Sequence, residues 1–398
     1  MKVLLVNKFL YEKGGTETYM LSLGRILAEH GHNVQYYGTA DERNTVGNIY
    51  NIYAPKREFG ESAKVKPSEV LSIIMSRKNK EQMLTLLKEY EPDVVHLNNI
   101  QYHLTPSIIL AVGAYRRKYK KKVRLIYTTH DYQLICPSHG LFDGKYRICE
   151  KCLGGNYLHC IGNKCVKASY AKSILGAMDG FFWRISRAYS EIDAIICPSR
   201  FLKSKLDINN VFRDKTIVLH NPVVLESGQI REKKEYVLDF GKFCKDKGTY
   251  TLLKACKELP DIKFVFAGYG PAEEDIKNTS NAEYVGFKTG EELTDLISEA
   301  LFSIYPSEWH ENCPYSVLES QILCTPVIAS KMGGIPELIR ENETGLLFEA
   351  GNHADLIDKI SILWNDRDRL KEMTNSCRQI EYETPETYYA KLEMIYKG

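Results

Sequence analysis

Short β-branched runs alternate with helical segments along nearly the whole chain, and this alternation limits the possible folds more than any other feature. Helical spacing separates most of the runs; Met20, Leu23 and Leu27, for example, mark one helix. Strands that alternate with helices favour a parallel sheet covered by helices on both faces. In the first half of the chain the predicted strands are Val3–Asn7, Asn33–Tyr37, Val94–Leu97, Arg124–Thr128, Ala194–Cys197 and Thr216–Leu219.

A polar, charged stretch at residues 223–235 interrupts the alternation and predicts a linker. We therefore expect an α/β protein with two doubly wound Rossmann-like domains, residues 1–222 and 236–382, facing each other across a cleft. Ligands of such sheets bind at the carboxyl ends of the strands. The predicted strands of the second domain are Tyr236–Phe240, Ile262–Ala267, Phe302–Tyr305, Pro326–Ser330 and Gly345–Phe348.

Length and composition exclude several classes of protein. The 398 residues suffice for two cores, and 44% hydrophobic with 26% charged residues excludes wholesale disorder. A net charge of +2 provides no general field for nucleic acid, so no nucleic-acid partner is expected. No run of 18 apolar residues predicts a membrane span, and the start turns polar too soon for a signal peptide. We expect a cytoplasmic chain.

Loops that follow strands carry the residues with candidate chemistry. Gly14 and Gly15 follow the first strand and open a helix, where a phosphate can approach the backbone closely. Lys242 and Lys247 follow the strand 236–240 and are suited to clamp a diphosphate without metal. The same glycines and lysines also suit an ordinary loop and a solvated turn.

A pair of carboxylates is the third element. Pro314 is excluded from a helix interior but suits a first turn, which places Glu311 on a loop and Glu319 inside the following helix. Carboxylates at these two heights are suited to grip the hydroxyls of two different sugars.

The order of these motifs resembles a known family. The acidic pair Glu311 and Glu319 lies after the Lys/Lys turn and before both the strand Cys324–Ala329 and the turn Gly333–Glu337. This arrangement is similar to retaining, nucleotide-sugar-dependent glycosyltransferases of family 4, which have the two-domain GT-B fold. The family usually has Arg then Lys on the diphosphate loop, whereas this chain has Lys242 first, which keeps the charge but lacks the bidentate fork.

The resemblance implies a role for each site residue. Backbone at Gly14 and Gly15 approaches the donor phosphate, Lys242 and Lys247 hold the diphosphate, Glu319 binds the ribose, and Glu311 faces the transferred sugar. His130, after the strand 124–128, touches the donor sugar from the opposite domain. The remaining donor contacts implied are Asn312, Cys313, Pro314 and Tyr315 beside sugar and phosphate, and Gly268 and Gly270 beside the nucleotide.

The resemblance also implies the reaction. A UDP- or GDP-sugar donates its sugar, with retention and without a cofactor for catalysis, to a saccharide or lipid-linked acceptor in cell-surface polysaccharide or glycoconjugate synthesis. A last helix, residues 385–398, crosses back onto the first domain. Two alternatives stay open: a non-hydrolysing nucleotide-sugar epimerase, and a catalytically silent nucleotide-sugar-binding scaffold.

Five of the 11 cysteines fall within 30 residues. Cys149 with Cys152, and Cys160 with Cys165, form two short hooks in a Gly-rich insertion, residues 136–165, and such paired hooks suit a structural Cys₄ zinc site. The further cysteine, Cys136, and also His159, are alternate ligands. Five reduced thiols are the other interpretation.

A basic run lies at Tyr115–Arg124, with seven Lys or Arg in ten residues, and bulky aromatics follow at Ile174–Arg184. Basic charge with interfacial aromatics is typical of a peripheral membrane surface, which we expect on the inner face of the membrane. A solvated helix end together with a buried aromatic helix is the competing interpretation.

Overall fold

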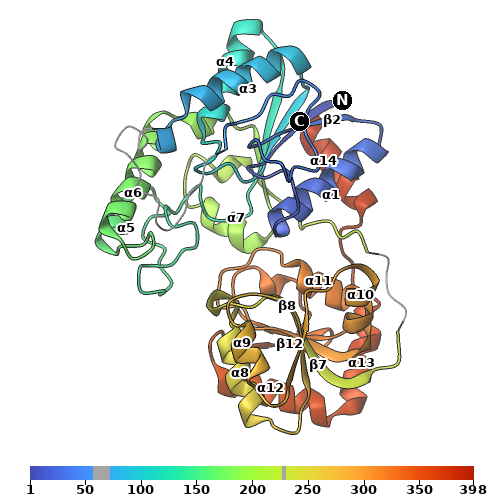
Figure 1. Cartoon of the computed structure of the whole chain (residues 1–398). Coiled ribbons are helices and arrows are strands. Elements are labelled where there is room, and N and C mark those ends of the chain that lie inside the picture. The colour runs from blue at the N-terminus through green and yellow to red at the C-terminus, as the bar shows by residue number, and fades with distance from the viewer. Residues whose placement is uncertain (57–71, 226–229) are drawn as a thin grey trace. The chain divides into compact units, whose positions relative to one another are not determined.

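The computed structural model describes residues 1–56, 72–225 and 230–398. It divides into two compact units, residues 1–220 with 385–398, and residues 221–384. Each unit has its own parallel sheet with helices on both faces (Figure 1). The centre of the predicted linker, residues 226–229, and the start of the helix predicted near residues 68–90 lie outside the described residues.

The first unit is built on a six-stranded parallel sheet of order β2-β1-β3-β4-β5-β6. Its strands are β1 (Lys2–Val6), β2 (Asn33–Tyr37), β3 (Val94–Leu97), β4 (Arg124–Thr128), β5 (Ala194–Cys197) and β6 (Thr216–Val218). Its α-helices are α1 (Gly15–Glu29), α3 (Arg77–Tyr90), α4 (Ser107–Tyr119), α5 (Leu158–Gly162), α6 (Tyr170–Ile185), α7 (Arg200–Leu206) and α14 (Pro385–Lys397), with short 3₁₀ turns η1 (Ala188–Glu191) and η2 (Arg213–Lys215).

The central strands explain why their sequences read as continuous apolar runs. Every residue of β3 and β5 is buried, because helices cover both faces of the sheet. The edge strand β2 is buried at its last residue only, so its sequence mixes polar with apolar residues.

The second unit repeats the plan with the sheet order β12-β11-β10-β7-β8-β9. Its strands are β7 (Lys234–Lys242), β8 (Phe264–Tyr269), β9 (Ala282–Gly286), β10 (Ala300–Tyr305), β11 (Val327–Ser330) and β12 (Gly345–Phe348). Its helices are α8 (Thr249–Glu258), α9 (Glu273–Lys277), α10 (Gly290–Glu299), α11 (Tyr315–Ile322), α12 (His353–Asn365) and α13 (Arg367–Cys377), with 3₁₀ turns η3 (Lys245–Lys247) and η4 (Ile335–Glu337).

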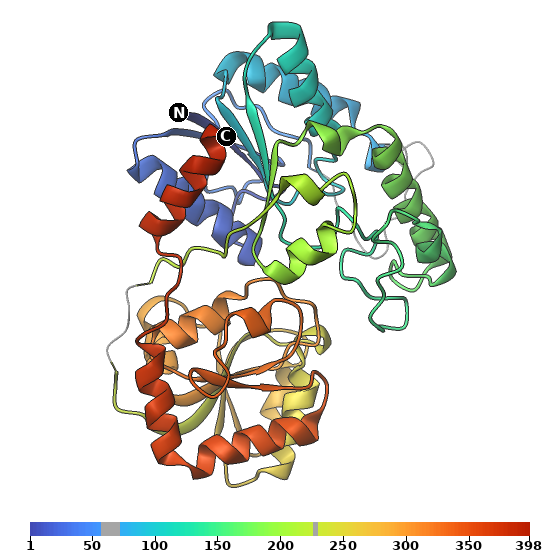
Figure 2. The same ribbon diagram turned by 180° about the vertical axis from the view of Figure 1, so that it is seen from behind.

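The C-terminal helix α14 completes the first unit and lies beside α1 (Figure 2). Tyr388 and Tyr396 are buried in it and join a chain of buried polar groups. The Tyr388 hydroxyl lies 2.5 Å from that of Tyr19 on α1, and the Tyr396 hydroxyl lies 2.6 Å from Nδ1 of His96 on β3. Thr128 Oγ1 on β4 links the two, at 3.1 Å from the Tyr19 hydroxyl and 2.7 Å from His96 Nε2.

Candidate active site

In each sheet the strand order reverses at one point, and loops diverge there to leave room for a ligand. In the second unit this point lies between β7 and β10, because β8 and β9 extend the sheet on one side and β11 and β12 on the other. Lys242 is the last residue of β7, and the loops that follow β7 and β10 carry Lys247 and Glu311. The strand order therefore places the predicted diphosphate and sugar residues at one end of one sheet.

The structure brings Lys247 and Glu311 together, although 64 residues separate them. The ammonium group of Lys247 donates to the Glu311 carboxylate and forms an ion pair with it. Ser307 Oγ donates to the same carboxylate at 3.0 Å. Burial opposes the charged form of Lys247, but neighbouring Tyr305 and Glu311 outweigh it and raise its pKa.

Glycines allow the loops to approach closely. Gly248 has a φ of +72°, and a Cβ there meets the Pro306 carbonyl oxygen at 1.9 Å. Gly333 has a φ of +62°, and a Cβ there meets the Glu311 carbonyl oxygen at 2.2 Å. The same Glu311 carbonyl accepts from the Gly334 N–H at 2.7 Å. Backbone contacts thus fix the loop that bears Glu311 from two sides.

Glu319 lies within α11, as predicted, and is half-buried. Burial raises the pKa of its carboxyl from 4.5 to about 7. Pro314 precedes the helix as its N-cap and has no side-chain acceptor for the N–H groups of the first turn. An α-helix N-terminus of this kind suits a phosphate or a sugar hydroxyl.

The other predicted residues of the second unit divide into two groups. Lys242 is the last residue of β7 and is exposed. The lysine that pairs with Glu311 is Lys247. Asn312 and Cys313 are buried, and the Cys313 carbonyl accepts from Asn221 Nδ2 at 3.1 Å, which fixes the approach to α11. Tyr315 is the first residue of that helix.

Gly268 and Gly270 have a structural reason to be glycine. A Cβ on Gly268 meets the Gly241 carbonyl oxygen at 1.9 Å, and one on Gly270, where φ is +156°, meets the Phe243 carbonyl oxygen at 2.1 Å. They let the end of β8 pack on the loop between Lys242 and Lys247 and so support that loop.

In the first unit, Gly14 and Gly15 begin α1 as predicted. Neither is required by its own surroundings. Gly14 is extended, with a φ of −178°, and a Cβ on Gly15 meets no protein atom within 4 Å. The space beside this helix start is open, as an approaching phosphate requires.

His130 follows β4 and is held by two neighbours. Its Nε2 lies 3.0 Å from Asn98 Oδ1, and its ring packs edge-on against Tyr19 at 4.8 Å between centroids. Burial lowers the pKa of His130 to about 3, so the imidazole is neutral at physiological pH.

Comparison with known proteins decides the family. A family model described as Glycosyltransferase Family 4 matches residues 13–227, more than half of the chain. The chain is a family 4 glycosyltransferase. A second model, Glycosyl transferases group 1, matches residues 224–380. An uncharacterized glycosyltransferase of Methanocaldococcus jannaschii is 26% identical over 305 residues, covering 74% of this chain and 85% of the relative.

Solved structures show the same fold. Sucrose-phosphate synthase from Thermosynechococcus elongatus has a TM-score of 0.70 at 16% identity, covering 100% of this chain and 98% of that one. HepE of Anabaena, solved in complex with UDP-glucose, has a TM-score of 0.65 at 14% identity, covering 100% and 99%. The predicted GT-B fold is confirmed, and both family models describe a glycosyltransferase.

Two charged residues of the glycosyltransferase that sequence reasoning passed over follow strands of the first sheet. Lys8 follows β1 and Asp131 follows β4, and Asp131 favours the charged form of Lys8, whose pKa burial lowers. His139 Nδ1 lies 3.9 Å from Asp131 Oδ2. The signal was available, because both residues follow strands directly. They place charged groups at the carboxyl end of this sheet.

The cysteines of the 136–165 segment gather in one region of the first unit. The thiols of Cys160 and Cys165 interact directly, and Cys152 interacts with Cys136, Cys149 and Cys165. Burial raises the pKa of Cys152 to about 12, and all 11 cysteines are free thiols. Throughout the described ranges, no three His, Cys, Asp or Glu side chains are grouped to hold a metal ion. His159 is exposed, and zinc stays a prediction.

Proposed function

We propose that this glycosyltransferase is a retaining, metal-independent enzyme that transfers a sugar from a UDP- or GDP-sugar to a saccharide or lipid-linked acceptor in cell-surface polysaccharide or glycoconjugate synthesis. The observation that carries the proposal is the ion pair of Lys247 with Glu311 at the point where the strand order of the second sheet reverses. The helix that follows Glu311 in the chain, α11, carries Glu319. This arrangement gathers a cation for the diphosphate and carboxylates for two sugars.

The lysines and the helix start account for metal independence in the proposal. Lys242 and Lys247, with the N–H groups at the start of α11, supply positive potential where the leaving diphosphate gains charge. Lys247 leaves its ion pair to bind phosphate, which frees the Glu311 carboxylate for the hydroxyls of the transferred sugar. Donor binding thereby replaces the ion pair of Lys247 with Glu311 by two contacts, one of Lys247 with phosphate and one of Glu311 with the sugar.

Retention follows, in the proposal, from front-face substitution. The departing diphosphate accepts the proton of the acceptor hydroxyl, and the new bond forms on the face that the diphosphate leaves. The neutral His130 is suited to hydrogen bonding and not to charge compensation. We assign the acceptor to the first unit, where Lys8 and Asp131 offer charged groups for hydroxyls. A donor with a uridine base accords with HepE, which was solved with UDP-glucose.

A thermal-shift screen over UDP-, GDP- and ADP-sugars tests the donor. A donor present at a hundred times its Kd stabilises the folded protein by about 2.7 kcal/mol, and we expect one nucleotide to stand out. Lys247→Ala removes the diphosphate contact, so the shift and the transfer activity should both disappear while circular dichroism stays like that of the parent. Lys245→Ala, an exposed lysine in the same 3₁₀ turn, is the matched control.

Two results contradict the proposal. Undiminished turnover of the Lys247→Ala protein excludes the assigned diphosphate contact. A product whose anomeric configuration is inverted relative to the donor, as read by NMR, excludes retention. Slow donor hydrolysis in the absence of acceptor distinguishes a transferase from a silent scaffold, and recovery of an epimerised donor identifies an epimerase.

A further inference from the structure

The helix α6 presents an apolar stripe to the outside of the first unit. Tyr170, Ile174, Met178 and Phe182 are spaced four apart, with Ile185 three further on, and each is between 38% and 79% exposed. At 3.6 residues per turn, these five positions fall within an arc of about 120°. Contiguous exposed apolar surface of this kind marks an interaction site.

The opposite face of α6 fixes which side points outward. Trp183 is buried, and its Nε1 donates to Asp179 Oδ1 at 2.9 Å. Asp179 also accepts from Gln101 Nε2 at 2.6 Å, which ties α6 to the body of the unit. Because this polar anchor is buried, the helix is not free to turn its apolar stripe inward.

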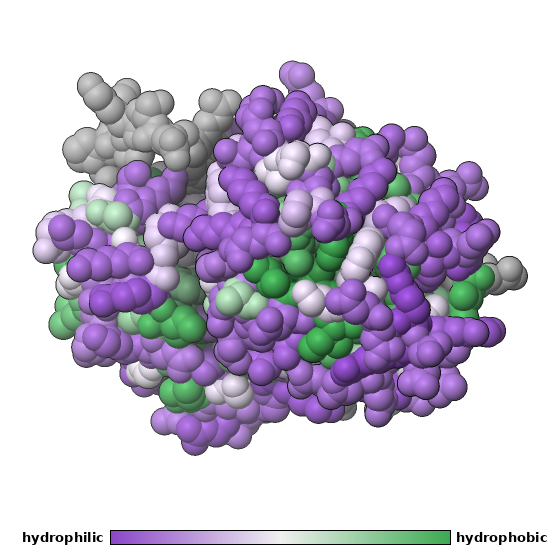
Figure 3. Space-filling model, turned by 90° about the horizontal axis from the view of Figure 1, so that it is seen from below, coloured by the Kyte–Doolittle hydropathy of each residue, from purple (hydrophilic) through white to green (hydrophobic). Residues whose placement is uncertain are grey.

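Segments near α6 carry further exposed apolar residues. Leu158 on α5, which packs on α6, is 61% exposed, and Tyr146 and Ile148 in the preceding loop are also exposed. Figure 3 shows hydrophobic side chains among polar ones along its left edge, the side on which Figure 1 places α5 and α6. We call these three residues and the five of α6 the α6 patch.

The charges around the α6 patch have one sign. Between residues 143 and 187 the exposed acidic residue is Glu150, which already pairs with Lys205, while Asp143 and Asp179 are buried. The exposed cations of the same segment are Lys145, Arg147, Lys151, Lys164, Lys167, Lys172, Arg184 and Arg187. Of these, Arg147 pairs with Asp143, and Arg184 donates to the Gly154 carbonyl at 2.7 Å.

Several of these cations border the stripe. The Lys164 ammonium lies 4.3 Å from the centre of the Tyr170 ring. On the helix, Arg184 lies about 40° beyond the Tyr170 edge of the stripe, whereas Lys172, although exposed, falls on the side of Asp179 and Trp183. An apolar stripe flanked by Lys and Arg, with aromatic residues in it, is the pattern of a helix that lies in a membrane interface.

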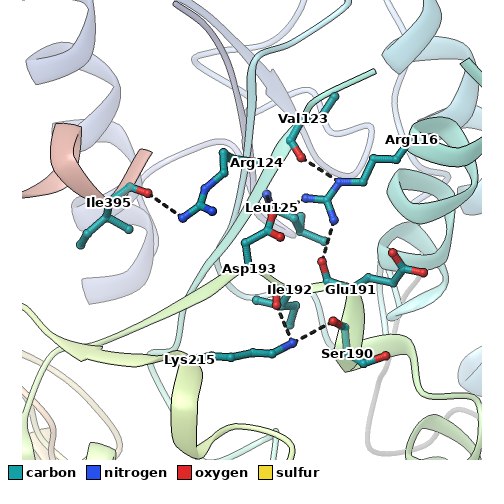
Figure 4. Close-up of polar contacts among 10 residues, drawn as sticks. All are labelled: Arg116, Val123, Arg124, Leu125, Ser190, Glu191, Ile192, Asp193, Lys215 and Ile395. Carbon is teal, nitrogen blue, oxygen red and sulfur yellow. Dashed lines mark hydrogen bonds and ion pairs between the residues drawn. The ribbon is translucent and has the colours of Figure 1, made fainter. Parts of the chain in front are cut away.

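The basic run at Tyr115–Arg124 carries less free charge than its sequence suggests. Arg116 donates to the Val123 and Glu191 carbonyls at 2.7 and 2.8 Å and forms an ion pair with Asp193, and Arg124 donates to the Ile395 carbonyl at 3.1 Å (Figure 4). Arg117 pairs with Glu191, and Lys121 with Glu91. The exposed lysines left at this end of α4 are Lys118, Lys120 and Lys122.

We propose that the α6 patch docks this protein onto a bilayer that contains anionic phospholipid, with the apolar stripe of α6 inserted at the interface and the flanking cations against the headgroups. The occupant is a lipid surface because the patch combines exposed apolar residues with charge of one sign. No helix in the described part of the chain is long and apolar enough to span a membrane, so this docking is peripheral.

Vesicle flotation tests the proposal with vesicles of phosphatidylcholine, alone or mixed with phosphatidylglycerol. The parent should float with the mixed vesicles, and less so at high salt. The triple variant Ile174→Gln, Met178→Gln, Phe182→Gln should lose binding. Each cation near an anionic surface contributes about fivefold to partitioning, so Lys164→Gln with Lys172→Gln should lower it by about 25-fold.

Matched controls lie in the same unit. Ile208→Gln with Val211→Gln removes exposed apolar residues elsewhere, and Lys118→Gln with Lys120→Gln removes exposed lysines of α4; both should bind like the parent. All changed side chains are exposed, and an unchanged melting temperature verifies folding.

Four outcomes overturn the proposal. The first is a parent that fails to float with anionic vesicles, and the second is an α6 variant that floats as the parent does. In the third, the parent self-associates without lipid and the α6 variant is monomeric by light scattering, which reassigns the patch to a second copy of this chain. Loss of binding in the Lys118/Lys120 variant alone places the membrane surface on α4 and also overturns it.

Discussion

Replacing Glu319 by Gln should stabilise this glycosyltransferase while abolishing transfer. Burial raises the pKa of the Glu319 carboxyl from 4.5 to about 7. The folded state therefore holds a proton that the unfolded chain has released between these two pH values, so stability falls as pH rises from 4.5 to 7. Glutamine has the shape of the protonated acid and carries no charge to bury, so the variant escapes this loss.

The magnitude follows from the two pKa values. Each pH unit of difference corresponds to 1.36 kcal/mol, so the charged carboxylate costs about 3 kcal/mol above pH 7. Because the side chain is half-buried, solvent screening reduces this, and we expect about 1–3 kcal/mol in favour of Glu319→Gln. Near pH 4.5 the folded carboxyl is protonated and the unfolded one is half protonated, so the difference should shrink below about 0.5 kcal/mol.

Urea unfolding of parent and variant across this pH range measures the difference, with transfer assayed on the same samples. Glu291→Gln, an exposed residue of α10, is the control and should follow the parent at every pH. A Glu319→Gln protein that is no more stable than the parent above pH 7 refutes the burial argument. One that is more stable and fully active refutes the assignment of Glu319 to the donor.

Three further predictions concern the first unit. Tyr396→Phe removes the hydroxyl 2.6 Å from buried His96 Nδ1 and should lower the free energy of unfolding by about 1–3 kcal/mol, with exposed Met394→Ala as the control. Deletion of residues 385–398 should expose core residues of the first unit and cause aggregation. A monodisperse, active truncation contradicts this prediction. If the cysteine hooks of residues 136–165 bind structural zinc, metal analysis of protein purified without added zinc should find about one equivalent, and a content far below that ends the claim.

Periodicity and β-branched runs predict most of the sheet, because strands buried on both faces must be apolar throughout. The strand β9 escaped prediction since it is an edge strand with no fully buried residue, so its sequence, Ala282–Gly286, carries little apolar signal. Pro314 was expected in the first turn of α11 and instead precedes the helix as its N-cap. The difference is one residue, and in both positions the proline stays out of the helix interior.

Contacts between loops that are distant in the chain could not be predicted from sequence spacing. The ion pair of Lys247 with Glu311 depends on β7 and β10 being neighbours, which is a property of strand order. The run at residues 115–124 appeared as free charge because its partners, Glu191 and Asp193, lie about 75 residues further on. The outward face of α6 likewise became evident only when Trp183 was seen to be buried.

The two carboxylates proposed to bind the donor differ in the partners that surround them, and the difference supports separate roles. Glu311 has a cation and a hydroxyl beside it, from Lys247 and Ser307, so its side chain already has polar partners within the protein. At Glu319 burial alone shifts the pKa, and no neighbouring charge offsets it. The buried carboxyl of Glu319 lowers the stability of the folded protein, and such a group is expected where a ligand supplies the hydrogen-bond donors that the protein does not. Ribose hydroxyls are donors of that kind. In the proposed donor complex, Glu319 gains its partners when the donor binds, whereas Glu311 first releases one.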